Sequence, residues 1–516
     1  MNTASRPRWI LLAILLAIPW LGVFALNFLP ALDRFLYAGT FAGVMAVFVT
    51  IGLASIWLLF FSRLRWAVRW KGLALFALAG GIAAALVRKD GHMGDFMPQL
   101  AWRWQPRPGE GLEQLQVPAS IPPDISFTTD QPGDSARFLG PDGSNFVSGS
   151  LLAADWHRRA PRELWRRPLG LGWSGFIVAG GFAITQEQRG DEELTVAYHL
   201  QTGQPLWQHA EKARFEESMG GNGPRATPTA HEGRVYALGA TGILVCLDGR
   251  TGKLLWRRDT LAEAGHQNLG WAKSCSPLIA GDKVIITLGK GDRCLAAYAA
   301  ATGEPAWRSG PGEASYASPV LAAIGGKPCV LAVLAHSAGA WDVANGAEVW
   351  SWTDGFKAAP AHAANPCFLP PDRVLVSIGY GVGSTLLSAS LGAPPQIVWH
   401  SLKMKPKFTN LVVRGTKAWG LDEGRLSCMD LATGEQLWRG SSYGHGQITG
   451  VGDSLLIQAE RGEVVIVEAS ESEEIVRSRF PALTSKTWNQ PCLAGRHLLV
   501  RNDREAVCFE LPGQTP

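Results

Sequence analysis

The sequence predicts an all-β fold class: an eight-bladed β-propeller of four-stranded antiparallel blades, preceded by three transmembrane α-helices. A turn segment that usually ends in tryptophan recurs at intervals of 38 to 51 residues. A strand, a turn and a second strand precede each copy, and the N-terminal region holds three uncharged apolar runs. A β-rich repeat of about 40 to 50 residues is typical of propeller blades. Apolar runs of about 20 residues are long enough to span a membrane.

The composition is that of a folded protein. Of the 516 residues, 47% are hydrophobic and 18% are charged, which excludes a disordered chain. The sequence holds 21 tryptophans against 7 tyrosines, so tryptophan is expected to have a repeated structural role. The net charge is +4, yet residues 1–90 carry nine basic and two acidic groups, which leaves the remainder mildly acidic. Such a body lacks the basic surface that nucleic acids require, so no nucleic-acid partner is expected.

Residues 1–90 are predicted to form an integral membrane domain. The predicted helices cover residues about 9–29, 36–62 and 70–88. The first two contain apolar runs long enough to span a bilayer. The third contains a shorter run, flanked by Lys71 and Arg88, whose long side chains can reach the two interfaces. A cleaved signal peptide is disfavoured, because a small-residue cleavage site is missing and a second apolar run follows at once.

Basic residues predict the orientation of this domain. Two precede the first helix and four lie between the second and third helices: Arg6, Arg8, Arg63, Arg65, Arg69 and Lys71. Asp33 and Arg34 cancel in the loop between the first two helices. The positive-inside rule places the N-terminus in the cytoplasm, so three crossings place the body on the periplasmic side of a bacterial inner membrane. If the third helix is only re-entrant, the body lies in the cytoplasm instead.

Residues 91–157 are predicted to be a Pro-rich extended linker. The segments "QPRPGEG" and "PASIPPDIS" carry several prolines and no helical periodicity. Such a composition is typical of a semi-rigid tether.

The repeat itself explains how the blades are built. Its clearest copies are "LQTGQPLW", "LDGRTGKLLW", "YAAATGEPAW" and "DLATGEQLW". The Asp side chain can bond the downstream backbone, and Gly supplies the positive φ that reverses the chain. The following strand carries a tryptophan, which is expected to pack between neighbouring sheets. The expected docking tryptophans are Trp165, Trp207, Trp256, Trp307, Trp350, Trp399 and Trp438, while a degenerate copy ends at Val476.

The two ends of residues 158–516 are predicted to close the ring. Eight third strands can be counted, and the last of them, near Cys508, has no fourth strand after it. The strand around Trp165 has no strand before it. Pairing these two strands completes an eighth blade and removes the open edge of the sheet.

The D-x-x-T-G-x-x-x-W pattern resembles the tryptophan-docking motif of the PQQ-repeat propellers, the quinoprotein alcohol dehydrogenase-like family. The resemblance covers roughly residues 160–512, and "FLGPDGSNFV" just upstream resembles the opening of many bacterial proteins with this domain. The family includes the dehydrogenases and also the BamB-like, non-catalytic propellers of the outer-membrane assembly machinery. The motif therefore implies the fold and leaves the function open, because the repeat is architectural.

The resemblance to the dehydrogenases implies a PQQ cofactor and a Ca²⁺ ion, with PQQ often stacked between a tryptophan and a disulfide of adjacent cysteines. The eight cysteines of this chain contain no adjacent pair, and no C-x-x-C-H haem site occurs. Histidines show no paired metal-ligand spacing. We therefore expect no catalytic residue, metal or cofactor, and interpret the chain as a non-catalytic binding or assembly scaffold of the cell envelope.

A less regular region predicts where a ligand would bind. By their position in the repeat, we expect the segments "TQEQRGDEELTV", "HAEKARFEESMGGNGPRATPT" and "NLGWAKSCSP" to lie at connections between blades, which converge at a propeller mouth. Acids, amides, arginines and a tryptophan there suit a small polar ligand or an envelope protein partner. The candidate residues are Gln186, Gln188, Arg189, Glu216, Glu217, Arg225, Trp271 and Lys273. The simpler interpretation is a solvated loop with ordinary ion pairs.

Two other functions remain open at this point. The first is a membrane-bound quinoprotein dehydrogenase that passes electrons to membrane quinone, since helices before such a propeller resemble membrane glucose dehydrogenases. In that case Trp271 would be a stacking platform for PQQ, and Glu216 or Glu217 a Ca²⁺ ligand. The second is a sensor that signals through its helices, for which the sequence offers no cytoplasmic output domain.

Overall fold

A computed structural model describes residues 8–28, 36–123, 125–129, 131–148, 152–153 and 155–513. The chain divides into two compact units, Met1–Arg107 and Pro108–Pro516.

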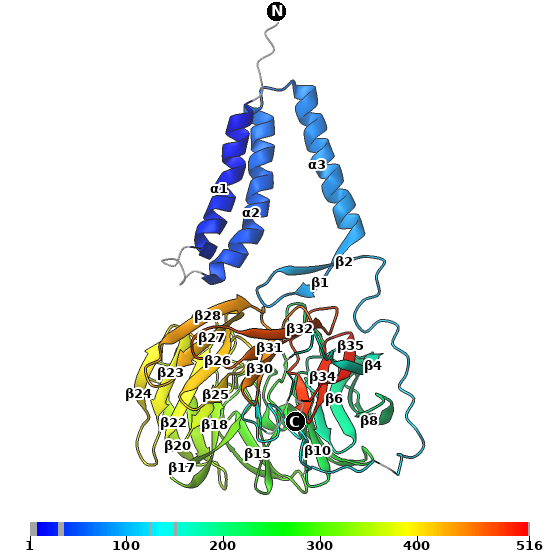
Figure 1. Ribbon diagram of the computed structural model, residues 1–516, viewed down its shortest axis with the longest axis vertical. Helices are drawn as coiled ribbons and strands as arrows, with labels where there is room; N and C mark the ends of the chain where they lie inside the picture. The colour runs from blue at the N-terminus through cyan, green and yellow to red at the C-terminus, as the bar shows by residue number, and fades with distance from the viewer. Residues whose placement is uncertain are drawn as a thin grey trace, which may run out of the picture. The chain divides into compact units, whose positions relative to one another are not determined.

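The first unit consists of helices and one β-hairpin (Figure 1). Its elements are α1 (Trp9–Phe28), α2 (Leu36–Ile56), a π-helical turn (Trp57–Phe61), α3 (Trp66–Leu86), β1 (Val87–His92) and β2 (Pro98–Trp102). Strands β1 and β2 pair antiparallel, with Val87 opposite Trp102.

One helix of this unit meets the requirements for a membrane span. Among the residues whose side chains are described, α3 is long and apolar enough to cross a bilayer by length and composition, and none of its apolar window is buried. Shorter apolar stretches cover Trp9–Phe24 and Met45–Phe61. The prediction of three spans is thus supported by length for one helix, and the other two spans stay predictions. Arg6 and the expected loop residues Asp33 and Arg34 lie outside the described residues.

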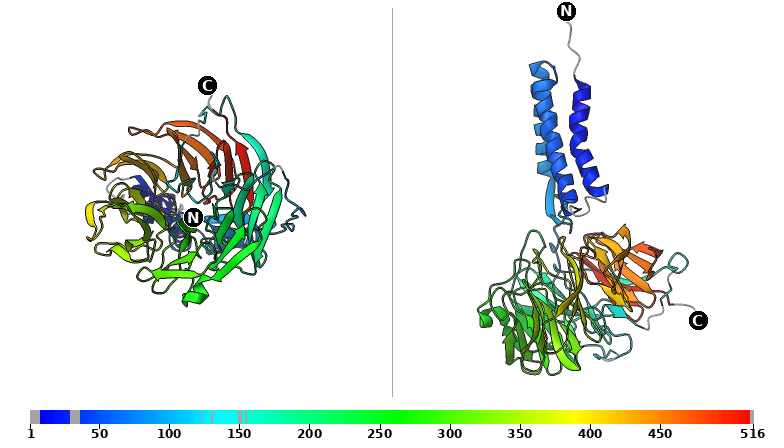
Figure 2. Two further views of the ribbon diagram at one scale, coloured as in Figure 1. Left: turned by 90° about the horizontal axis from the view of Figure 1, so that it is seen from below. Right: turned by 90° about the vertical axis from the view of Figure 1, so that its left-hand side faces the viewer.

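The second unit is a ring of eight β-sheets, which Figure 2 shows from one end. Blade one comprises β5 (Ile177–Ala179), β6 (Phe182–Arg189), β7 (Glu192–His199) and β8 (Pro205–Glu211), and blade two comprises β9 (Thr229–His231), β10 (Arg234–Leu238), β11 (Ile243–Asp248) and β12 (Leu254–Asp259). Blade three comprises β13 (Leu278–Ala280), β14 (Lys283–Thr287), β15 (Leu295–Ala299) and β16 (Pro305–Ser309). Blade four comprises β17 (Val320–Ile324), β18 (Lys327–Val333), β19 (Ala338–Asp342) and β20 (Glu348–Trp352). A short helix, α4 (Thr260–Ala264), follows blade two.

Blades five to eight repeat the same order of strands. Blade five comprises β21 (Cys367–Leu369), β22 (Arg373–Ile378), β23 (Gly383–Ser388) and β24 (Gln396–Ser401), and blade six comprises β25 (Val412–Arg414), β26 (Lys417–Asp422), β27 (Arg425–Asp430) and β28 (Gln436–Ser442). Blade seven comprises β29 (Gln447–Val451), β30 (Ser454–Gln458), β31 (Glu463–Glu468) and β32 (Val476–Pro481). Blade eight comprises β33 (Cys492–Ala494), β34 (His497–Arg501), β35 (Glu505–Glu510) and β4 (Arg162–Pro168). First strands of neighbouring blades contact one another, so they line the axis.

The two ends of the ring meet in blade eight. Strand β4 pairs antiparallel with β35, and Cys508 lies opposite Trp165. The eight-bladed propeller of four-stranded antiparallel sheets is therefore confirmed.

Every blade has the same irregularity between its third and fourth strands. In blade two, Trp256 lies opposite Cys246, and the register shifts before the next pair, Leu247 with Leu254. The corresponding shift occurs in the other seven blades. A bulge of this kind increases the local twist. In blade two the unpaired residue is Leu255, directly before the docking tryptophan in the fourth strand.

The docking tryptophans join each blade to the next. The indole N–H of Trp207 in blade one donates to the carbonyl of Gly249, in blade two, over 3.1 Å. Equivalent bonds are made by Trp165, Trp256, Trp307, Trp399 and Trp438. Trp350 differs, because its Nε1 is buried without a hydrogen-bond partner among the described residues. The next turn, in blade five, reads "LGAPP" and lacks the Thr-Gly found in blades one, two, three and six.

Blade seven departs from the repeat. Ser478, two residues beyond Val476, lies opposite Ile466 at the docking position. Trp156 packs against Phe480 of this blade, with ring centroids 5.3 Å apart, and its backbone N–H donates to the Ser478 hydroxyl over 3.0 Å. A tryptophan from outside the repeat thus packs next to the position where the repeat lacks one.

The second half of the predicted linker is packed on the propeller. Phe146 and Val147 form β3, which pairs in parallel with β29 as a fifth strand of blade seven. Ser135 bridges Val178 in the first strand of blade one, and Ile125 lies in the hydrophobic core of blades one and two. First strands expose an unpaired edge toward the axis, and this segment satisfies part of it. At these described positions the chain is therefore packed on the propeller and is not the extended tether predicted for residues 91–157.

Candidate functional site

Backbone-to-side-chain hydrogen bonds link the starts of six neighbouring blades near the axis. Each of five backbone N–H groups donates to a side-chain oxygen of the next blade: Gly175 to Thr227, Thr227 to Ser276, Ser276 to Ser318, Ser318 to Asn365, and Asn365 to Asn410. The donor–acceptor distances are 2.8 to 3.0 Å. These bonds fix the connections that enter each first strand, and thereby position the side chains just upstream.

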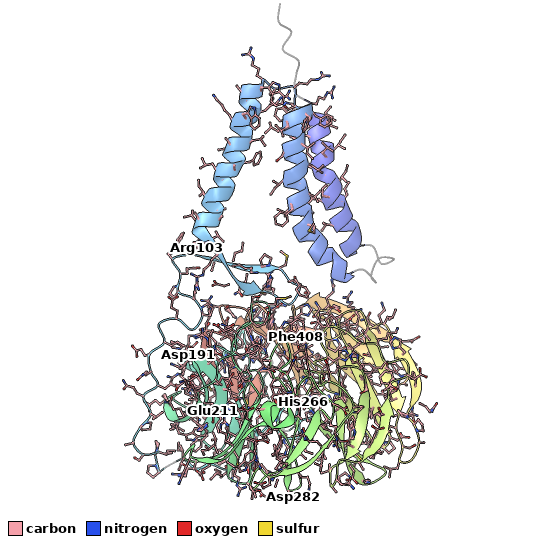
Figure 3. All side chains as sticks on the ribbon, turned by 180° about the vertical axis from the view of Figure 1, so that it is seen from behind. Arg103, Asp191, Glu211, His266, Asp282 and Phe408 are labelled. Carbon is pink, nitrogen blue, oxygen red and sulfur yellow. The ribbon has the colours of Figure 1, made fainter. Side chains whose placement is uncertain are left out.

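Gln447 and Gln490 take the corresponding place in blades seven and eight. Side chains two residues before these eight positions form what we call the mouth cluster. Six of the eight blades carry an aromatic ring, a histidine or an arginine there: Trp173, Arg225, Tyr316, Phe408, His445 and Trp488. Ring centroids lie 5.0 Å apart for Trp173 with Trp488 and for Trp488 with Phe408. Figure 3 shows Phe408 at the end of the propeller opposite Asp282, which lies in the turn between β13 and β14.

A lysine lies over two of these rings. The Lys486 ammonium is 3.9 Å from the centroid of Trp488 and 4.9 Å from that of Trp173. Burial lowers the pKa of Lys486 to about 8, although the charges of Asp503 and Glu460 oppose the shift. A partly desolvated cation over aromatic faces is stabilised by the ring quadrupoles, so the protein itself occupies this pair of faces.

Glu460 and Lys407 satisfy the polar groups around His445. Glu460 accepts hydrogen bonds from the indole N–H of Trp488 over 2.7 Å and from the backbone N–H of His445 over 3.1 Å. The Nζ of Lys407 lies 3.2 Å from His445 Nε2 and 3.4 Å from a carboxylate oxygen of Glu423. Burial, and then the Lys407 charge, hold the pKa of His445 well below 6.5, so a neutral imidazole accepts from Lys407.

Three of the predicted site residues meet around Gly220. A Cβ on Gly220 would lie 3.1 Å from Arg225 Nη2, 3.2 Å from Glu217 Oε2 and 3.3 Å from the Trp271 ring. Arg225 donates to the carbonyl of Trp271 over 2.6 Å and to that of Gly221 over 2.8 Å. Burial lowers the pKa of Arg225 to about 10, so it stays charged at neutral pH.

Glu217 is engaged within its own loop. One carboxylate oxygen accepts from the backbone N–H of Met219 over 2.8 Å, and the other from that of Gly220. The backbone N–H of Glu217 donates to Asn222 over 3.0 Å. The carboxylate therefore closes the loop that precedes blade two, and holds the backbone against Trp271 and Arg225.

Gln186, Gln188 and Arg189 lie in β6, within blade one rather than in a connection between blades. The side-chain amide of Gln186 donates to the carbonyl of Ala226 over 2.7 Å, and the amide oxygen of Gln188 accepts from a backbone N–H of the following connection. Arg189 pairs with Glu187 over 2.7 Å. The expectation that this segment is a connection is wrong, because β6 pairs with β7 without interruption as far as Arg189 opposite Glu192, so these residues extend a hairpin.

The last two predicted residues have separate surroundings. Glu216 is exposed and pairs with Arg214, which also contacts Asp191 over 2.8 Å. Lys273 is fully buried, and its ammonium donates to the hydroxyl of Thr287 over 3.3 Å and to the carbonyl of Leu288. Burial lowers the pKa of Lys273. Lys273 therefore satisfies acceptors inside blade three.

The residues named for the dehydrogenase alternative do not fit a Ca²⁺ site as they lie. Both oxygens of Glu217 accept backbone N–H groups, and Glu216 pairs with an arginine. Across the described ranges, no group of three His, Cys, Asp or Glu side chains is placed to hold a metal ion. The Trp271 ring packs 5.6 Å from Tyr316 at 43°. Carboxylate-rich oxygen sets are what Ca²⁺ requires, so we derive no step through a metal or PQQ.

Sequence reasoning missed most of the mouth cluster. Its members come from connections spread between Trp173 and Trp488, and no local motif joins them. The available signal was the repeat itself, because aligning the copies places an aromatic or basic residue at the same offset from most first strands. Arg225 is the member that the predicted site already included.

The comparisons with known proteins agree with this architecture. The family described as "Outer membrane protein assembly factor BamB" matches residues 190–354 and 422–510. A search of curated proteins found no match. The resemblance to PQQ-repeat propellers predicted from the tryptophan motif is confirmed.

Solved structures show the same fold at low sequence identity. BamB from Moraxella catarrhalis is 16% identical, with a TM-score of 0.50, covering 68% of this chain and 100% of that chain. The computationally designed Ika8 protein is 12% identical, with a TM-score of 0.50 and the same coverage. A europium-containing methanol dehydrogenase is 10% identical, with a TM-score of 0.56, covering 74% of this chain and 99% of that chain. Because both a designed protein and an enzyme share the fold, the fold alone does not select a function.

Proposed function

We propose that this PQQ-like propeller is a non-catalytic scaffold of the cell envelope that binds a protein partner at its mouth cluster. The proposal is carried by one observation: polar side chains at the mouth are bonded within the protein, whereas aromatic side chains there are partly exposed. Glu217, Arg225 and Glu460 bind backbone or indole groups of the protein itself. The aromatic side chains of Tyr316, Phe408 and Trp488 are only half-buried.

Partly exposed aromatic side chains suit protein recognition. Trp, Tyr and Arg are enriched among the residues that dominate binding energy at protein interfaces. Here a network of hydrogen bonds holds such side chains in place, so a partner would meet a preorganised surface and little side-chain entropy would be lost. The family described as an outer-membrane assembly factor supports a partner of the same kind, a protein of the bacterial envelope.

We further propose that the first unit anchors the protein in the inner membrane, with the N-terminus in the cytoplasm and the propeller on the periplasmic side. Helix α3 has the length and apolarity of a span. Arg63, Arg65, Arg69 and Lys71 lie at or before its first turns. Basic residues beside a span favour the cytoplasmic side, which would direct the C-terminal end of α3 outward.

Site-specific crosslinking tests the scaffold function. A photoreactive phenylalanine analogue at Phe408 is expected to give a discrete adduct with an envelope protein in living cells. The same analogue at Asp282, exposed at the other end of the propeller, is the matched control (Figure 3). Adducts of equal yield from both positions would argue against a site at the mouth.

Cofactor binding tests the dehydrogenase alternative. The purified full-length protein is incubated with PQQ and Ca²⁺, and the bound cofactor is measured by absorbance after gel filtration. We expect no retention. Stoichiometric retention together with dye-linked oxidation of an alcohol or sugar would replace the scaffold function by an oxidoreductase.

A further inference from the structure

The β1–β2 hairpin follows α3 directly and is fixed to its end. Helix α3 ends at Leu86 and β1 begins at Val87. After β2, the backbone N–H of Arg103 donates to the carbonyl of Leu86 over 2.9 Å, and its guanidinium donates to that of Ala84 over 3.2 Å. Figure 3 shows Arg103 at this end of the helix. The last carbonyls of a helix have no partner within it, and here the hairpin supplies one.

A partly buried ion pair stiffens the base of the hairpin. Arg88 and Asp90 are joined over 2.6 Å, and their side chains are 11% and 5% exposed. The same guanidinium donates to the carbonyls of Gln105 over 2.6 Å and of Pro106 over 3.1 Å. The segment that follows β2 is therefore held in a fixed position beside the hairpin.

The hairpin nevertheless exposes large apolar side chains. Leu100 is 64% exposed, Trp102 45% and Trp104 66%. The two indoles stack on each other, with centroids 4.9 Å apart and an angle of 10° between the rings. Lys89 lies opposite Leu100 in the register, so it shares that face and adds a positive charge. A compact, rigid element that exposes such side chains next to an amine indicates a surface that something else covers.

We propose that this hairpin lies in the headgroup layer of the membrane that α3 crosses, with Leu100, Trp102 and Trp104 in the interface and Lys89 beside anionic lipid headgroups. The inference rests on the anchoring proposed above. If α3 spans the bilayer, its last residue is at the boundary of the hydrocarbon core, and the attached hairpin lies within the next few ångströms. Tryptophan is enriched at that depth, and lysine near the surface is attracted to anionic lipids.

Three single fluorescent labels test the depth of the hairpin in the full-length protein. Cysteine is introduced as Ile82→Cys in α3, Leu100→Cys in the hairpin and Leu391→Cys in the propeller, and each variant is labelled with NBD. All three native side chains are at least 43% exposed. Of the eight native cysteines, seven are buried and Cys367 is half-buried, so the unmodified chain gives the labelling background. The proteins are reconstituted in vesicles of phosphatidylcholine and phosphatidylglycerol that contain spin-labelled lipids.

The expected result is a different quenching pattern for each label. The label at position 82 is quenched most by lipids with a deep spin label, and the label at 100 most by lipids with a shallow one. The label at 391 shows neither effect. Quenching at 82 together with a label at 100 that behaves like the one at 391 would overturn the inference and leave the anchor intact. A label at 82 without quenching would overturn the anchor, and the inference with it.

The lipid preference is tested with the same labelled position. Quenching at position 100 is expected to increase when phosphatidylglycerol replaces part of the phosphatidylcholine, and the Lys89→Gln exchange should remove that increase. Lys283→Gln in the propeller is the control. If Lys89→Gln leaves the dependence on phosphatidylglycerol unchanged, the assignment of Lys89 to anionic headgroups is wrong.

Discussion

Gly252 lies directly against the indole of Trp207, so that a Cβ on Gly252 would come within 2.5 Å of the ring. The two residues belong to neighbouring blades, Trp207 to β8 and Gly252 to the turn between β11 and β12. Gly252 also has a φ of +70°. The glycine and the tryptophan of the repeat are therefore coupled across blades, and the same contact joins Trp165 to Gly203, Trp256 to Gly303, Trp307 to Gly346 and Trp399 to Gly434.

We expect Gly252→Ala to destabilise the propeller by about 2 to 5 kcal/mol, because overpacking costs about 1 to 3 kcal/mol and a left-handed alanine about 1 to 2 kcal/mol. Gly392→Ala is the matched control, since Gly392 has a φ of +76° and no atom within 4 Å of its would-be Cβ. Denaturant unfolding of both variants measures the difference. Equal losses would mean that backbone strain, and not the contact with Trp207, requires the glycine.

The indole hydrogen bonds predict unequal effects of the same exchange in two blades. Trp207→Phe removes a bond to Gly249, whereas the Nε1 of Trp350 has no partner among the described residues. Because both exchanges remove a similar ring volume, Trp207→Phe should cost about 1 kcal/mol more than Trp350→Phe, the usual contribution of one hydrogen bond. Thermal unfolding of the two variants measures this. A larger loss for Trp350→Phe would contradict the role assigned to the indole N–H.

Asn145 joins three blades although it lies in the predicted linker. Its amide donates to the carbonyls of Leu411 over 3.2 Å and Ile448 over 2.9 Å, and its oxygen accepts from Gln490 over 3.1 Å. We expect Asn145→Ala to cost about 1 to 3 kcal/mol, because these buried groups lose their partners. Asn345→Ala, at an exposed turn, is the control. Urea unfolding midpoints of the two variants measure the difference. Equal midpoints would contradict a structural role of Asn145.

Part of the predicted linker is expected to belong to the folded propeller unit. A chain that starts at residue 158 lacks β3, Trp156 and the bridge at Ser135, so it should be less stable than a chain that starts at residue 108. We expect a lower melting temperature and faster proteolysis for the shorter chain, because the edge of β29 and part of two hydrophobic clusters become exposed. Equal stability of the two chains would show that the segment only covers the surface.

His445 predicts a loss of stability in mild acid. Its pKa in the folded protein is held well below 6.5 by burial and by Lys407. In the unfolded chain the imidazole binds a proton as the pH falls below about 6.5, while in the folded chain it does not, so protons favour unfolding. The free energy of unfolding should therefore fall as the pH is lowered from about 6.5 to 5. His445→Gln should remove part of this pH dependence. The control exchange His157→Gln, at an exposed site, should leave it unchanged. An unchanged slope in His445→Gln would contradict a buried neutral imidazole.

Most of the fold was predictable because it repeats. The Thr-Gly turn, the tryptophan and the apolar third strand recur, and each acts through neighbours that are close in sequence or exactly one blade away. Counting third strands was enough to predict eight blades, and the unpaired strands at Trp165 and Cys508 predicted the closure that β4 and β35 show. The docking position of blade seven was not predictable by counting, because its turn is two residues longer and Ser478 takes the place expected for Val476.

The candidate site was less predictable, because it is built from contacts between residues far apart in sequence. Composition identified Arg225, Glu217 and Trp271 as polar and aromatic residues near a mouth, and the structure brings these three together around Gly220. Gln186 lies instead within strand β6 of blade one, and the buried ammonium of Lys273 binds acceptors of blade three. Their hydrogen-bond partners, Leu288 and Ala226, cannot be read from local sequence.

By itself, the sequence determined the blade count, the strand pattern, the docking tryptophans and the apolar character of the N-terminal region, since these follow from periodicity and local turn chemistry. Tertiary structure alone decided which side chains form the mouth cluster, how residues 125–147 pair with the first strands, and which faces of Trp102 and Trp104 stay exposed. The physical reason is that burial and hydrogen bonding depend on what the closed ring brings together, and a ring closes only when its first and last strands meet.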